Sequence, residues 1–76
     1  MNKPYIAIIG TYDEYTTEQV VLKETMVQAK NELEAHKIAF YKCNIRENHI
    51  VLKILDYNNK RVLFDHFKGF MTKEME

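Results

Sequence analysis

One cysteine in 76 residues limits how this chain can hold a fold. Cys43 has no second cysteine to pair with, so no disulfide within the chain is possible. Domains of this length bury a core that is barely sufficient, and many are stabilised by a disulfide, a metal or a partner subunit. The composition therefore predicts a single domain over 1–76 in a reducing compartment such as the cytoplasm, stabilised by a partner subunit or a metal.

Charge and hydropathy exclude few partner classes. Eleven basic and eleven acidic residues cancel, so net charge does not favour a nucleic acid or an acidic partner. The apolar run at 5–9 is too short for a signal peptide, and no stretch approaches the about 20 apolar residues of a membrane span. We expect a soluble, cytoplasmic protein without membrane contact. Its many Lys, Asn, Ile and Glu residues are typical of AT-rich genomes, including those of bacteriophages.

The segment from Thr16 to Lys37 predicts a long helix. Thr16 and Gln19 have the spacing of a capping box, and neither glycine nor proline follows before Lys37. The spacing of the apolar residues then predicts an amphipathic helix of about five turns. Its apolar stripe consists of Leu22, Met26, Ala29 and Leu33.

Strands are predicted on both sides of this helix. The apolar run Tyr5–Ile9, ended by Gly10, predicts an inner strand buried on both faces. After the helix the apolar period becomes two, and Asn-containing breaks read as hairpin turns. The strands predicted there are 38–46, 49–57 and 61–67, with a short helix or tail over 68–76.

These elements predict an α+β fold, specifically a two-layer sandwich. One long helix packs on a mostly antiparallel four-stranded sheet in the order β-α-β-β-β. In the last hairpin, one register sets Ile54 opposite Phe64 and Lys53 opposite Asp65. The competing register sets Asp65 opposite Leu52 and buries a carboxylate among apolar side chains, so the first register is preferred.

This register leaves one sheet face away from the helix, with mixed apolar, aromatic and basic side chains. Such a face is too apolar for solvent and too charged for a core, which predicts a contact surface. Aromatic and arginine side chains are common anchors of protein–protein interfaces. The predicted partner-binding residues are Phe40, Lys42, Arg46, Lys53, Leu55, Tyr57, Arg61, Leu63 and Phe67.

The function expected from this surface is non-enzymatic protein binding. The chain would act as a homodimer, or as a small inhibitor or adaptor of a larger host protein, encoded by a phage or mobile element. The first alternative is RNA binding, because cations interleaved with rings on a sheet suit phosphates and bases. RNA is expected ahead of DNA in that case.

The second alternative is a small enzyme or ligand binder that uses the loop after the first strand. Asp13 and Glu14 lie in that loop, a common position for ligand sites in α/β sheets. No glycine-rich phosphate loop accompanies them. The metal-ligating candidates Cys43, His36, His49 and His66 lack the spacing of a metal site. We therefore expect no metal, no cofactor and no catalytic residue.

Overall fold

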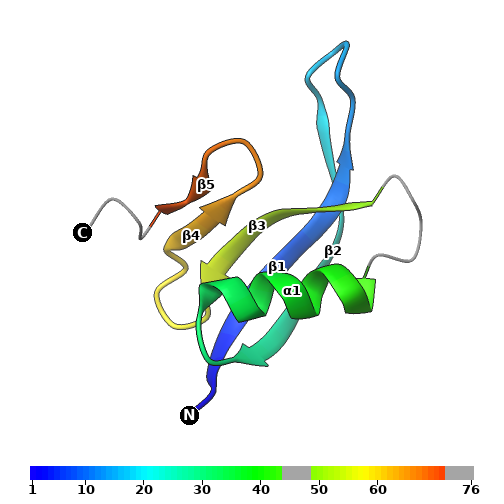
Figure 1. The fold of residues 1–76 in the computed structure, drawn as a ribbon. Helices are drawn as coiled ribbons and strands as arrows, with labels where there is room; N and C mark the ends of the chain where they lie inside the picture. Colours follow the sequence, from blue (N-terminus) through cyan, green and yellow to red (C-terminus); the bar gives the residue numbers. More distant parts are fainter. Residues whose placement is uncertain (44–48, 72–76) are drawn as a thin grey trace.

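The sheet of this protein begins with a long hairpin that precedes the helix (Figure 1). The structure is a computed structural model that describes residues 1–43 and 49–71, with the backbone alone for Lys42 and Cys43. The strands pair antiparallel in the order β2-β1-β3-β4-β5. The elements are β1 (Lys3–Tyr12), β2 (Gln19–Ala29), α1 (Glu32–Cys43), β3 (Ile50–Asp56), β4 (Val62–Asp65) and β5 (Gly69–Phe70).

The predicted α+β arrangement, one helix against an antiparallel sheet, agrees with the structure. The finer predictions are wrong, because the described residues form five strands and two of them precede the helix. The strand expected at 38–46 is helical as far as Cys43, and its remainder lies outside the described residues. In the predicted tail, β5 occupies Gly69–Phe70, and residues 72–76 are outside the description.

Half of the segment predicted as a helix, Gln19–Ala29, forms β2 instead, whereas residues 32–37 belong to α1 and are helical as predicted. Most of its residues pair with β1, from Gln19 opposite Tyr12 to Ala29 opposite Lys3. Several β-branched residues, which fit a pleated strand better than a helix, occur in it. The supposed apolar stripe is not a core face, because half of the Leu22 and Met26 surfaces is exposed. Pairing with a distant segment therefore overrides the local helical spacing.

The helix begins at Glu32, with a capping motif at Asn31 and Glu34 rather than the one predicted at Thr16. The Asn31 side chain accepts a hydrogen bond from the Glu34 N–H at 2.9 Å, and the Glu34 carboxylate accepts one from the Lys30 N–H at 2.6 Å. The first bond satisfies an N–H group that the first helical turn leaves free, and the second ties the residue before the cap to that turn. Ala35 and Ala39, one turn apart, are fully buried and let α1 lie close to the sheet.

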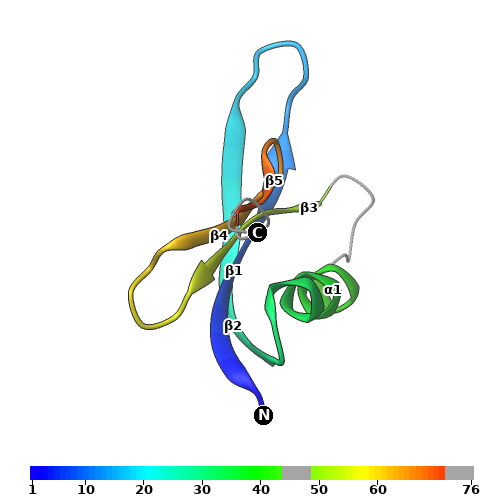
Figure 2. The ribbon, with the colours of Figure 1, turned by 60° about the vertical axis from the view of Figure 1, so that its left-hand side comes forward.

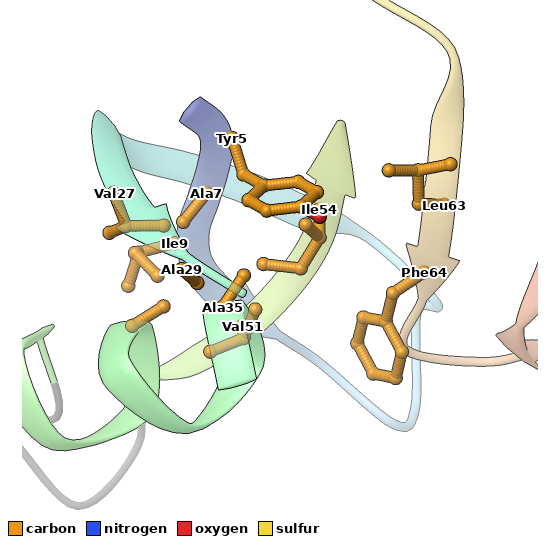
Figure 3. Close-up of a cluster of buried hydrophobic side chains, with 11 residues drawn as sticks. Tyr5, Ala7, Ile9, Val27, Ala29, Ala35, Val51, Ile54, Leu63 and Phe64 are labelled. Carbon is orange, nitrogen blue, oxygen red and sulfur yellow. The ribbon is translucent and has the colours of Figure 1, made fainter. Parts of the chain in front are cut away.

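The core lies between α1 and one face of the sheet (Figure 3). Tyr5, Ala7 and Ile9 alternate along β1 and point toward the helix, as the burial of every second residue shows. Ile54 of β3 is the largest side chain that is fully buried. The other buried members of this cluster are Val27, Ala29, Ala35, Ala39, Val51, Leu63 and Phe64.

Each described hairpin turn starts with an aspartate. The Asp13 carboxylate accepts hydrogen bonds from two backbone N–H groups of its turn, at 2.8 and 3.3 Å. Asp56 repeats this arrangement at 2.8 and 3.2 Å, and Asp65 accepts one such bond at 2.9 Å. In the first two turns the fourth residue after the aspartate, Thr17 or Lys60, has a positive φ. Aspartate side chains stabilise turns in this way.

The register predicted for the β3–β4 hairpin is confirmed at two pairs. Lys53 lies opposite Asp65, and Ile54 lies opposite Phe64. The turn itself closes one residue earlier than predicted, since the Asp56 N–H donates to the Arg61 carbonyl at 2.9 Å. A bulge then restores the expected pairs.

Candidate interaction surface

The candidate surface is the face of the sheet opposite α1, which we call the open face. Directly opposed residues of neighbouring strands share a face, so alternation along β1 and the strand registers identify its members. Every described element other than α1 is a strand of the sheet, so no second layer covers this side (Figure 2). The open face consists of Pro4, Ile6, Ile8, Tyr12, Gln19, Val21, Glu24, Met26, Gln28, Ile50, Lys53, Leu55, Val62 and Asp65.

An apolar row crosses four strands of the open face. Met26 of β2 lies opposite Ile6 of β1, Ile6 opposite Leu55 of β3, and Leu55 opposite Val62 of β4. Met26 is 48 % exposed, and the other three side chains are half-buried by their neighbours alone. A continuous apolar row without a covering layer is typical of a surface that contacts another molecule.

A charged row runs beside it. Glu24 lies opposite Ile8, Ile8 opposite Lys53, and Lys53 opposite Asp65. Lys53 is the one cation among the described residues of the open face, and two carboxylates share its row. The row therefore has no excess of positive charge.

The structure places only part of the predicted binding set on this face. Lys53 and Leu55 belong to it. Leu63 does not, because the β4 bulge sets Val62 opposite Leu55 and leaves Leu63 only 6 % exposed in the core. Phe40 and Lys42 lie on α1, and their predicted position on a strand is therefore wrong.

The remaining predicted residues are at other positions. Tyr57 and Arg61 flank the β3–β4 turn and are exposed. Phe67, in the turn after β4, packs its ring edge-on against Tyr12 with centroids 4.6 Å apart. Arg46 lies outside the described residues.

Several residues of the open face were missed by sequence reasoning. Ile6 and Ile8 were assigned to a strand buried on both faces, and Glu24 and Met26 to a helix. The alternation from Tyr5 to Ile9 is invisible in the sequence because every residue there is apolar. These residues could have been found if 19–29 had been recognised as a strand, because β1 would then be the first strand of a hairpin.

The loop considered for catalysis or ligand binding forms the tip of the β1–β2 hairpin. A shallow, open depression there is lined by residues that include Asp13, Glu14 and Glu18. The Asp13 carboxylate accepts the two turn hydrogen bonds, which accounts for that residue structurally. Within the described part of the chain, no three His, Cys, Asp or Glu side chains are grouped as a metal ion would require.

Packing against aromatic rings affects the titration of His36. Its ring lies edge-on to Phe64 and Phe70, with centroids 4.5 and 6.0 Å away. Burial lowers the pKa of His36 below its usual 6.5, and the neighbouring charge of His66 lowers it further. The packed state between α1, β4 and β5 therefore favours the neutral imidazole.

This shift predicts that stability decreases in mild acid. Below pH 6.5 the unfolded chain binds a proton at His36 before the folded chain does. The free energy of unfolding should fall as the pH drops below 6.5 and level off once His36 is protonated in the folded chain too. Urea unfolding at stepped pH measures it, and His36→Gln should flatten this slope. An equal slope in both proteins would contradict the assignment.

Comparison with protein-family models, with curated proteins and with solved structures gave no match to this chain. Among the described residues, no helix is long and apolar enough to cross a membrane. The functional argument therefore rests on the open face.

Proposed function

We propose that this protein is a non-enzymatic binding module that contacts another protein surface through the open face. The observation that supports the proposal is the row Met26–Ile6–Leu55–Val62, which is apolar across four strands and has no covering layer among the described elements. A 76-residue domain gains little stability from its own core, so additional burial of such a row is favourable. The partner is either a second copy or a larger protein that the chain inhibits or links to others.

Electrostatics favours a protein over RNA as the partner. Sheet-based RNA binders present several cations beside exposed rings. The described open face instead has Lys53 in one row with Glu24 and Asp65, and its aromatic side chain, Tyr12, packs against Phe67. Mixed charges beside an apolar row suit a protein surface of complementary pattern.

Capture experiments test this proposal. The immobilised chain is exposed to a lysate that also contains untagged copies, and bound proteins are identified by mass spectrometry. Met26→Glu places a carboxylate in the apolar row at a half-exposed position that tolerates substitution. We expect this variant to lose the captured proteins, because an unpaired charge would be desolvated in the interface.

Tyr41→Glu is the matched control. Tyr41 is 79 % exposed on α1, in the layer opposite the open face, so this variant should keep full capture. Equal capture by both variants would contradict the proposal. Nucleic acid that co-purifies and is released by moderate salt would contradict it in favour of RNA binding.

A further inference from the structure

The charges of the open face are arranged unsymmetrically about β1. Glu24 on β2 and Lys53 on β3 are both directly opposite Ile8 of β1. Neighbouring strands are about 4.8 Å apart, so the Cα atoms of the two residues lie at similar distances on either side of Ile8. A negative charge on one side of β1 is therefore matched by a positive charge on the other.

The rows on both sides of this charged row have apolar residues on both flanks of β1. In one of them, Met26 and Leu55 flank Ile6. In the other, Val21 and Ile50 flank Gly10. At Gly10 the β3 flank also contributes Leu52, whose Cδ1 lies next to the glycine. Rotation by half a turn about β1 would thus exchange apolar with apolar positions, and Glu24 with Lys53.

We infer that the open face binds a second copy of this chain, with the two-fold axis of the dimer parallel to β1. This inference rests on the proposed function and names its partner. Two stacked sheets lie about 10 Å apart and cross at about 30° because each is twisted, so the axis bisects this angle and stays nearly parallel to β1 of each copy. Glu24 then faces Lys53 of the second copy twice per dimer, and Ile6 and Ile8 meet their own counterparts. The assembly has four layers, with α1 of each copy outside.

The charge pattern selects this axis over the alternative. An axis across the strands at the level of the charged row would place Glu24 over Glu24 and Lys53 over Lys53. Like charges opposed at close range disfavour that arrangement. In the chosen arrangement Lys53 lies between Asp65 of its own chain and Glu24 of the second copy.

The free edge of β2 is a weaker candidate for self-association. β2 ends the sheet, and most of its length is exposed. Lys23 and Glu24 stand at its centre, and charges on an edge strand oppose pairing with another edge. The open face has no such obstacle once Glu24 faces a lysine.

The contact is small enough to be reversible. Three strands and three rows cover roughly 300 Å² of projected sheet, whereas a standard interface buries about 800 Å² of accessible surface per partner. We therefore expect a dimer that dissociates on dilution. Sedimentation velocity over a concentration series of the whole chain measures its dissociation constant.

Charge reversal tests the pairing itself. Glu24→Lys and Lys53→Glu should each raise the dissociation constant at least about tenfold, because both copies then oppose like charges. The double variant Glu24→Lys/Lys53→Glu restores opposite charges across the axis. It should return the constant to within about threefold of the unmodified chain.

Lys37→Glu is the control, since it makes the same charge change as Lys53→Glu at an exposed position of α1. It should leave the constant unchanged, and circular dichroism confirms that each variant is folded. A monomer at all concentrations, or a double variant as weak as the singles, overturns the second copy as partner. If Met26→Glu still abolishes capture of another protein in that case, the contact function stands without the dimer.

Discussion

Ile54→Ala should lower the free energy of unfolding by about 2–5 kcal/mol, the usual cost of truncating a fully buried aliphatic side chain. Ile54 is completely buried in β3, the central strand of five, and lies opposite both Ala7 and Phe64. Its near neighbour Ala7 is too small to fill the cavity. A chain of 76 residues has roughly 4–11 kcal/mol of total stability, so the variant loses a large share. Urea unfolding followed by circular dichroism measures the loss.

Two controls separate this cavity from general fragility. Ile54→Val removes one methylene at the same site and should cost about 0.5–1.5 kcal/mol. Leu33→Ala removes an exposed side chain of α1 and should change stability by less than about 0.5 kcal/mol. If Ile54→Ala were as mild as Leu33→Ala, the core would not be centred on β3.

The β3–β4 hairpin was predictable because its information is local. A turn rich in Asn separates two apolar runs, and only one register keeps the Asp65 carboxylate out of the core. The structure has Lys53 opposite Asp65, as that argument requires. The bulge that buries Leu63 was not predictable, since it depends on how the turn at Asp56 closes.

The β1–β2 hairpin was not predicted because two local signals agreed on a helix. Leu22 and Met26 have helical spacing, and the pair Thr16 and Gln19 resembles a capping box. In the structure the 19–29 segment forms hydrogen bonds with β1, a non-local partner that periodicity cannot reveal. The turn aspartate Asp13, with the same role as Asp56, was the available signal.

The missed hairpin also explains why the observed surface differs from the predicted one. The expectation that one sheet face lies away from the helix holds, and Lys53 and Leu55 are on it. More than half of its described residues, however, lie on β1 and β2, and none of them comes from 38–46. The apolar row centred on Ile6 therefore replaces the aromatic and basic set that the sequence suggested.

Gly10→Ala should be costly for a reason specific to this hairpin. The pairing register of β1 shifts close to Gly10 with both neighbouring strands. The shift toward β2 is between Ile9 and Gly10, and the shift toward β3 is between Ile8 and Ile9, because each neighbour has one extra residue there. A Cβ at this position would collide with the backbone carbonyl of Val20 and approach Cδ1 of Leu52 to 2.8 Å. The leucine can rotate, but the carbonyl moves only if β2 moves away from β1.

We expect Gly10→Ala to cost about 3 kcal/mol, at the upper end for overpacked sites. The loss should be greatest in the distal hairpin, so hydrogen exchange at the amides of Thr11 and Val20 should quicken more than at Ile54. Gly69→Ala is the matched control. Gly69 has a φ of 83° and no atom within 4 Å of its Cβ position, so only backbone strain of about 1 kcal/mol is expected there. A larger loss for Gly69→Ala than for Gly10→Ala would mean that β1 and β2 do not pack as closely at Gly10 as the structure shows.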